Sequence, residues 1–164
     1  MNLPKRKPTR LKGFNYSRAG AYFVTICTHN RKCILSHIVG EGLCTLPKNE
    51  LTQIGTEADK CIQYINNHSD NINIEKYVIM PKHIHLIVML NNTGGRGSPP
   101  LQSIVRRLKT YTTNKFGATL WQRSFHDHII RDEADYEKIW NYIDSNVLRW
   151  ELDCFYNSES KKED

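Results

Sequence analysis

The chain has 164 residues, of which 39% are hydrophobic and 24% charged, and these values predict one soluble domain with a core of ordinary size. No apolar run approaches the roughly 20 residues of a membrane span, and the N-terminus lacks the apolar stretch of a signal peptide, so a cytoplasmic, nucleoid-associated protein is expected. The five cysteines are scattered without a CxxC pair, which argues against a disulfide framework or a zinc finger.

Basic residues give the chain a net charge of +6 and a pI of about 9.1, which favours an anionic partner, with nucleic acid the leading candidate. One basic group crowds the first 18 residues, and a second lies on a predicted helix. Such runs are often only solvated surface or a flexible tail. On charge, we predict that DNA is contacted by Lys5, Arg6, Lys7, Arg10, Lys12, Arg106, Arg107 and Lys109.

In chain order, the first predicted elements are an arm, a strand, a hairpin and a helix. Residues 1–18 are basic, contain two prolines and lack periodicity, which predicts an irregular arm. Residues 21–28 are rich in β-branched and aromatic side chains and predict a strand. A Gly-Glu-Gly turn within residues 34–46 predicts a hairpin. Apolar side chains near a 3.6-residue period predict an amphipathic helix over residues 51–67.

The next elements are two strands, a helix and a further strand. A strand is predicted over residues 73–80, and beyond Pro81 a second strand carries two histidines. After a Gly/Ser/Pro loop, residues 101–115 predict a helix with Gly117 as its stop signal. Residues 124–131 predict another strand. Together the elements predict an α+β fold in which helices pack on a mostly antiparallel sheet.

His83 and His85 are the most informative residues of the chain, because they emerge from an otherwise apolar strand. Side chains at positions i and i+2 of a strand point the same way, so the two imidazoles lie side by side. Burying two unpaired imidazoles is costly, and a divalent metal is one compensation. The alternative is a pair of half-exposed histidines hydrogen-bonded to their neighbours.

A last helix is predicted from residue 132 to about residue 146, with acidic residues at its positive end. Tyr142 and Asn146 lie four residues apart on one of its faces. A tyrosine hydroxyl can act as a covalent nucleophile, and an amide oxygen can complete the coordination of a metal. A metal so held could polarise a phosphodiester oxygen while tyrosine attacks phosphorus. The alternative is that Tyr142 packs with its hydroxyl bonded locally and Asn146 ends or caps the helix.

The sequence Val-Ile-Met-Pro-Lys-His-Ile-His-Leu-Ile-Val at residues 78–88 resembles the His-hydrophobic-His strand of the single-tyrosine HUH transposases. Within that group it is most similar to the REP-associated tyrosine transposases, which carry the transposase IS200-like domain. Further segments resemble motifs of this family in the same order, at residues 10–16, 20–28, 120–131 and 142–146.

The resemblance implies a ferredoxin-like HUH core, for which we expect a domain over residues 19–152, between the arm at residues 1–18 and a flexible tail at residues 153–164. It implies cleavage and rejoining of single-stranded, hairpin-bearing DNA through a 5′-phosphotyrosine link. It also implies that the arm helps to read DNA at the foot of the hairpin, and that a monomer is favoured over a dimer.

The resemblance further implies that Tyr142 is the nucleophile and that His83, His85 and Asn146 hold Mg²⁺ or Mn²⁺. The sequence departs from the family at Val147, where proline commonly follows the asparagine. Because proline tends to stop a helix, its loss predicts that the helix can run on past Asn146.

Two other functions stay open at this point. One is a domesticated protein that binds a DNA hairpin without catalytic turnover. The other is a metal-dependent nucleic-acid hydrolase that uses water as its nucleophile. A second His-x-His pair, His126 and His128, is assigned to structure or DNA contact, and Tyr77 and Tyr111 are interpreted as packing residues.

Overall fold

The structure, a computed structural model, describes residues 14–16, 18–40, 46–91 and 100–150. Its strands and helices follow one another as β1 (Gly20–Cys27), β2 (Ser36–Val39), β3 (Lys48–Leu51), α1 (Gln53–Asn67), β4 (Ile72–Met80), β5 (His83–Leu90), α2 (Pro100–Phe116), β6 (His126–Ile130) and α3 (Glu133–Asp144), with a short 3₁₀ turn, His29–Arg31, after β1. Each predicted strand and helix is confirmed, with shifts of one or two residues at most ends.

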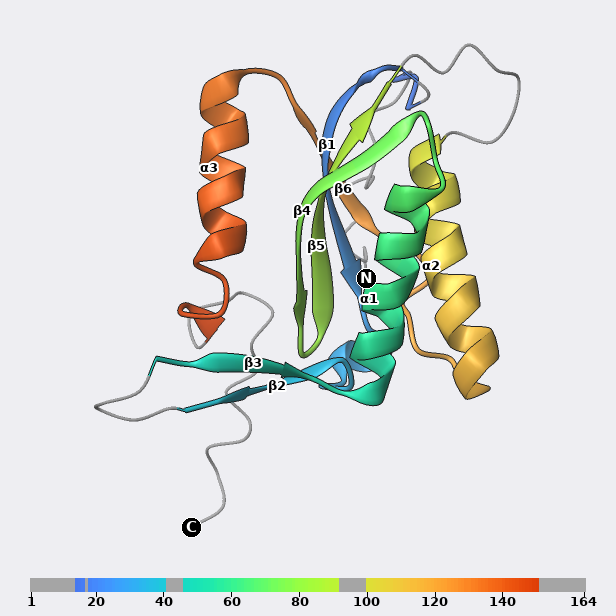
Figure 1. Ribbon diagram of the computed structural model, residues 1–164, viewed down its shortest axis with the longest axis vertical. Helices are drawn as coiled ribbons and strands as arrows, with labels where there is room; N and C mark the ends of the chain where they lie inside the picture. Colours follow the sequence, from blue (N-terminus) through green and yellow to red (C-terminus); the bar gives the residue numbers. More distant parts are fainter. Residues whose placement is uncertain (1–13, 17, 41–45, 92–99, 151–164) are drawn as a thin grey trace, which may run out of the picture.

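Four strands form one antiparallel sheet in the order β4-β5-β1-β6 (Figure 1). Taken with the helices between them, β1-α1-β4-β5-α2-β6 is the ferredoxin-like arrangement that the resemblance implied, and the predicted α+β class is confirmed. The predicted hairpin is confirmed in part: β2 lies within residues 34–46 and pairs with β3, but β3 lies beyond that range, at Lys48–Leu51. It forms a separate two-stranded sheet that projects past the end of the β4–β5 hairpin.

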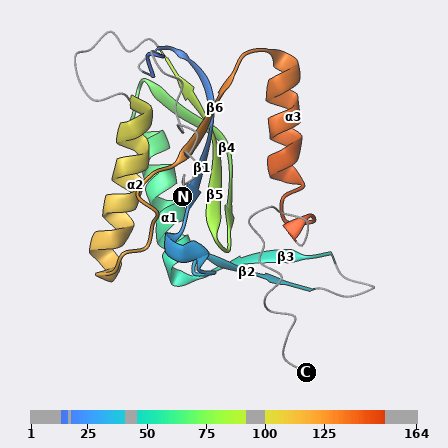
Figure 2. The same ribbon diagram turned by 180° about the vertical axis from the view of Figure 1, so that it is seen from behind.

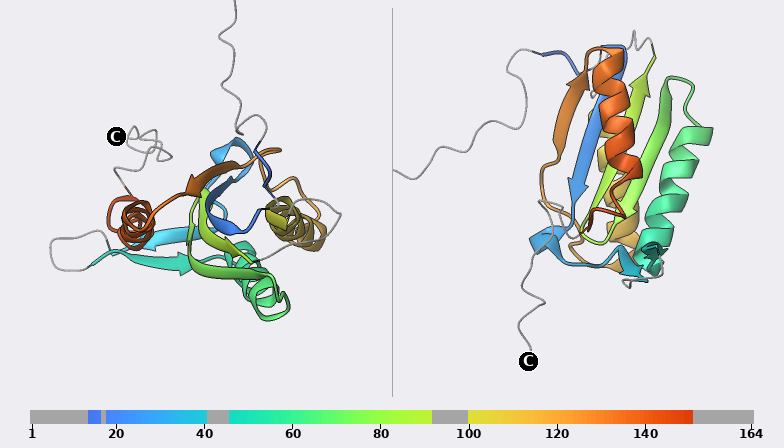
Figure 3. Two further views of the ribbon diagram at one scale, coloured as in Figure 1. Left: turned by 90° about the horizontal axis from the view of Figure 1, so that it is seen from above. Right: turned by 90° about the vertical axis from the view of Figure 1, so that its left-hand side faces the viewer.

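The sheet separates two unequal apolar layers (Figures 2 and 3). Helices α1 and α2 cover one face and enclose the main core, whereas α3 lies on the opposite face. The main core takes alternate residues of the central strands, which are Tyr22, Val24, Ile26, Ile84, Leu86, Val88 and Leu90. The smaller cluster beneath α3 contains Ile87, Ile130, Ile139 and Ile143. The intervening residues of the same strands are therefore free to build a site on the α3 face.

The start of α1 is tied closely to the chain before β2. The hydroxyl of Thr52 accepts a hydrogen bond from the Gly55 amide at 3.1 Å, as an N-cap residue does. A Cβ placed on Gly55 would lie 1.9 Å from the carbonyl oxygen of Leu35. Glycine is therefore required at this close approach of helix and loop. Gly117 follows α2, where the sequence predicted that helix to stop. Its φ of 64° is a left-handed conformation that glycine adopts readily.

Helix α3 begins as its sequence predicts but ends earlier. Asp132 is the N-cap and accepts a hydrogen bond from the Asp135 amide at 2.8 Å. The helix ends at Asp144, two residues before its predicted end, and the loss of the family proline does not let it run on past Asn146. The Ser145 hydroxyl donates to the carbonyl of Asn141 at 2.8 Å, and the Asn146 amide donates to the carbonyl of Ile143 at 3.2 Å. These bonds turn the chain without a proline.

No helix among the described residues is long and apolar enough to cross a membrane. The predicted arm falls almost entirely, and the predicted tail wholly, outside the described residues.

Candidate metal and nucleophile site

His83 and His85 lie at the start of β5, on the face of the sheet that α3 covers. Their ring centroids are 4.4 Å apart, and their residues are 0% and 1% exposed. The alternative of two half-exposed histidines is therefore wrong. The pair is placed by the strand alternation, because the intervening Ile84 points into the main core.

Thr25 of β1 is the cross-strand partner of His85, and its Oγ1 lies 2.8 Å from His85 Nδ1. On the same face Phe23 stacks on the His85 ring, with centroids 5.1 Å apart. Burial, and then the neighbouring His83, lower the pKa of the His85 imidazole well below its usual value. His85 is therefore a neutral imidazole at physiological pH, the form that binds a metal.

Tyr142 reaches the histidine pair from α3. Its hydroxyl lies 3.4 Å from His85 Nε2, and its ring meets Phe23 edge-on with centroids 6.1 Å apart. The hydroxyl is therefore directed at a residue 57 positions away rather than bonded locally. The tyrosine is 36% exposed as a residue, so its side chain extends from the surface of the protein to a buried histidine.

Contacts with the edge strand hold α3 in this position. Lys76 of β4 forms an ion pair with Asp144 and lies over the Trp140 ring, with its Nζ 4.2 Å from the centroid. One helical turn earlier, the Tyr136 hydroxyl donates to Glu75 at 2.6 Å. The helix is thus fastened to the sheet of its own chain along its length.

Asn146 follows α3 and is 3% exposed. Its Oδ1 is buried and accepts no hydrogen bond from the described residues. In the chain Asn146 lies between Tyr142, which contacts His85, and Trp150, whose ring lies 6.2 Å from that of His83. It is not the cap of α3, a role taken by Ser145.

A buried amide oxygen that accepts no hydrogen bond destabilises the folded state by about 1–3 kcal/mol, and a bound cation would satisfy it. Two imidazoles and an amide oxygen are neutral groups of the kinds that bind divalent metals, although the described residues contain no cluster of three His, Cys, Asp or Glu side chains. Such a set is poor in charge and lacks thiolate, which disfavours structural zinc.

The basic residues predicted to contact DNA are divided by the fold. Lys5, Arg6, Lys7, Arg10 and Lys12 lie outside the described residues. Arg106 and Arg107 are exposed on α2, across the sheet from the histidines. Lys109 donates to the carbonyls of Gln122 at 2.7 Å and Ser124 at 2.9 Å. Burial lowers the pKa of Lys109 to about 8, so this lysine mainly anchors the loop before β6.

Sequence reasoning missed Thr25 and Phe23, because nothing in the local pattern reveals which residue stands across the strand from His85. It assigned no specific role to the second histidine pair. His126 and His128 share the α3 face of the sheet, and His128 Nε2 lies 2.8 Å from the carboxylate of Asp135 on α3. His128 therefore anchors the start of the helix.

No protein-family model matches the sequence. The chain is similar to a solved structure described as a REP-associated tyrosine transposase bound to a REP hairpin, with a TM-score of 0.61 and 23% identity, over 81% of this chain and 69% of that one. That similarity shows the fold. A protein of Haemophilus influenzae described as uncharacterized is 34% identical over an alignment of 173 positions, which takes in 92% of this chain and 93% of the relative. The chain belongs to the same family as this Haemophilus influenzae protein.

Proposed function

We propose that the protein is a metal-dependent endonuclease and strand transferase that acts on single-stranded, hairpin-bearing DNA through Tyr142. The observation that carries the proposal is the approach of the Tyr142 hydroxyl to 3.4 Å from Nε2 of a buried, neutral His85. The fold shared with a transposase bound to a REP hairpin supports DNA of that kind as the partner.

His83, His85 and Asn146 are the residues that would hold Mg²⁺ or Mn²⁺. When bound, the ion would supply Lewis-acid polarisation of a phosphate oxygen. The chain itself supplies the nucleophile and its position. Tyr142 attacks phosphorus, a bond forms between its oxygen and phosphorus, and the bond to the 3′ oxygen breaks. Solvent water accepts the tyrosine proton as the attack proceeds and supplies the proton that the departing 3′ oxygen takes up. The 5′ phosphate stays on Tyr142 until a 3′-hydroxyl attacks it in turn.

The experiment is a covalent-adduct assay with a hairpin oligonucleotide that carries a single-stranded extension, in Mn²⁺, read on a denaturing gel. Tyr142→Phe keeps the ring and removes the attacking oxygen, so it should bind DNA but form no adduct. Tyr136→Phe is the matched control on the same helix. The Tyr136 hydroxyl is bonded to Glu75, and burial and this bond raise the pKa of Tyr136 to about 12. This variant keeps Tyr142 and the Lys76–Asp144 ion pair that also holds α3, so it should still form the adduct, with at most a small loss of rate from the missing Glu75 bond.

The same gel separates the other two functions. Cleavage without any adduct would identify a hydrolase that uses water, and binding with neither cleavage nor adduct would identify a hairpin-binding protein without turnover. An undiminished adduct in Tyr142→Phe would place the nucleophile elsewhere.

The basic arm is proposed to help select the DNA. Its phosphate contacts would contribute affinity that falls as salt rises. Deleting residues 1–12 should therefore weaken binding and blur sequence choice while the fold is kept. Equal sequence selectivity in the truncated protein and the full chain would show that the arm takes no part in DNA recognition.

A further inference from the structure

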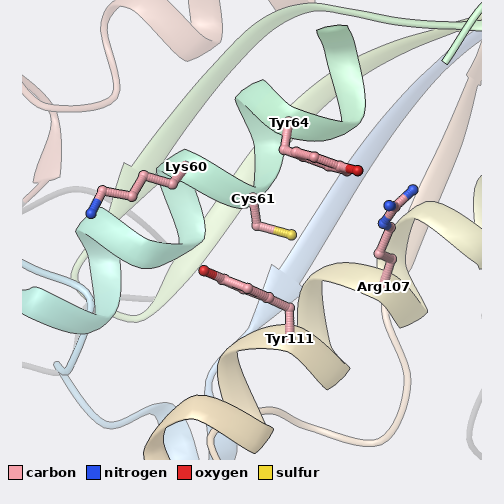
Figure 4. A pocket seen from close by; sticks show the side chains of 5 residues that line it. All are labelled: Lys60, Cys61, Tyr64, Arg107 and Tyr111. Carbon is pink, nitrogen blue, oxygen red and sulfur yellow. The ribbon is translucent and has the colours of Figure 1, made fainter. Parts of the chain in front are cut away.

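A cavity of about 380 Å³ opens between α1 and α2, on the face of the sheet opposite to the histidines (Figure 4). It is lined by Lys60, Cys61, Tyr64, Arg107 and Tyr111. The volume falls within the range of about 300–1,000 Å³ that is usual for small-molecule sites. Nothing in the nucleophile site requires it, because the four-stranded sheet lies between the two.

Two tyrosines form opposite walls of the cavity, and the Cys61 sulfur points between them (Figure 4). Tyr64 and Tyr111 are 48% and 41% exposed, although Tyr111 was predicted to be a packing residue. Figure 4 shows the two rings apart, one on each side of the Cys61 sulfur. Burial raises the pKa of the Cys61 thiol, so the floor of the cavity is uncharged at neutral pH.

Both tyrosine rings are held in place by neighbours outside the cavity. His68 stacks on Tyr64, with ring centroids 4.1 Å apart and planes 13° apart. The Tyr111 hydroxyl donates to Glu57 at 2.9 Å. A site with fixed walls loses little conformational entropy when a ligand enters.

The charge at the mouth is positive. The guanidinium of Arg107 lies 4.9 Å from the Tyr64 ring centroid and forms no ion pair with a described residue. The nearby carboxylate of Glu57 is already paired with Lys60 at 2.9 Å and Lys115 at 2.6 Å. No acidic residue lines the cavity itself. Aromatic walls with a guanidinium beside them suit a ligand that is planar at one end and anionic at the other.

We propose that this cavity binds an unpaired nucleotide, with its base between Tyr64 and Tyr111 against Cys61 and its phosphate at Arg107. Base–aromatic stacking tolerates any base, so the site would hold a strand without reading its sequence. That the nucleotide belongs to a DNA strand, rather than being free, rests on the proposed function. In that case the cavity would retain the single-stranded extension of a hairpin on the far side of the sheet from Tyr142.

The first test is photocrosslinking with a hairpin whose single-stranded extension carries one 5-iododeoxyuridine, moved along the extension from one oligonucleotide to the next. Mapping of the crosslinked peptides should place the adduct on Tyr64 or Tyr111. The Tyr142→Phe variant should crosslink equally, because the cavity needs no chemistry at the nucleophile. The result is therefore independent of whether the proposed cleavage is correct.

The second test compares the affinity of three variants for the same hairpin by fluorescence anisotropy. Arg107→Gln and Tyr64→Leu should each weaken binding by about fivefold or more, as expected when one stacked base is lost. Arg106→Gln removes the same charge from the neighbouring position of α2 and measures the loss due to charge alone. The loss in Arg107→Gln should exceed it several-fold. Removing the extension from the hairpin should make all three variants alike.

Competition by free nucleotides tests whether the cavity binds a free nucleotide as well as one within a DNA strand. If dTMP or dAMP abolishes the crosslink at millimolar concentration, the site accepts the nucleotide unit itself, which supports the proposal. Crosslinks to neither tyrosine, together with equal losses in Arg107→Gln and Arg106→Gln, would overturn it.

Discussion

Thr25 Oγ1 and His85 Nδ1 lie 2.8 Å apart across the β1–β5 pair, and both residues are buried. A proton on Nδ1 that is donated to Thr25 would leave Nε2 with its lone pair, available to a metal. The available nitrogen, Nε2, is the one that faces the Tyr142 hydroxyl. We therefore propose that Thr25 is a positioning residue for the site.

Replacing this threonine tests that assignment. Thr25→Val keeps the shape and removes the hydroxyl, so it should weaken metal binding about 10- to 100-fold, as loss of a partner of a histidine ligand does. Thr25→Ser should retain most of the affinity. The readout that a purely structural role would leave unchanged is the tautomer of His85, measured by ¹⁵N NMR of the metal-free protein. An unaltered tautomer in Thr25→Val would contradict the role.

Metal binding should be visible as stability without any DNA. Mn²⁺ that binds only the folded state adds about 2.7 kcal/mol at a concentration of 100 Kd, so the melting temperature should rise. His83→Ala and Asn146→Ala should each reduce that rise. His126→Ala, which removes an exposed histidine from the second His-x-His pair, is the control and should keep it. A rise of the same size in all three variants would place the ion elsewhere.

The nucleophile is expected to act on its own chain. Helix α3 is fastened to β4 by the Lys76–Asp144 ion pair and by the Tyr136–Glu75 hydrogen bond. A mixture of His83→Ala and Tyr142→Phe proteins should therefore form no adduct, since each chain lacks one required part. Recovered activity in the mixture would show that two chains exchange their helices. Sedimentation of the unmixed protein should show a monomer.

The acid dependence of stability should reveal the Glu57 network between α1 and α2. Hydrogen bonds from Lys115, then Lys60 and Tyr111, lower the pKa of Glu57 from 4.5 to about 2. The folded state thus holds this carboxylate in its charged form more strongly than the unfolded chain does. The stabilisation is complete above about pH 4.5 and is lost as pH falls towards 2. Thermal melts of Glu57→Gln should show a shallower fall than the unmodified protein over that range.

The structural features that depend on local periodicity were the ones predicted best from the sequence. Alternation along one strand correctly placed His83 and His85 together and away from Ile84. It could not place Thr25, because cross-strand register depends on the whole sheet rather than on any short pattern.

Helix surfaces were harder to assign than strands. Arg107 lies between His85 and Tyr142 in sequence but on the other side of the sheet from both. The face of the sheet on which a helix packs depends on the topology of the whole fold, so the local sequence of α2 does not reveal it. Tyr111 was interpreted as a packing residue, yet the buried stripe of α2 runs through Leu108 and Thr112 and leaves Tyr111 at its border. The end of α3 was misjudged because Ser145, rather than a proline, turns the chain.

The alternation along β5 gives neighbouring positions different evolutionary freedom. Ile84 and Leu86 face the main core, and truncation of such residues typically costs about 2–5 kcal/mol. His83 and His85, one step away, face the site and are not members of that core cluster. A lineage could therefore lose the histidines, and with them any chemistry, while the same fold persisted under selection for its surfaces alone. In a comparison of many relatives, the two histidine positions and the main-core positions of this one strand would record the age of the activity and the age of the fold separately.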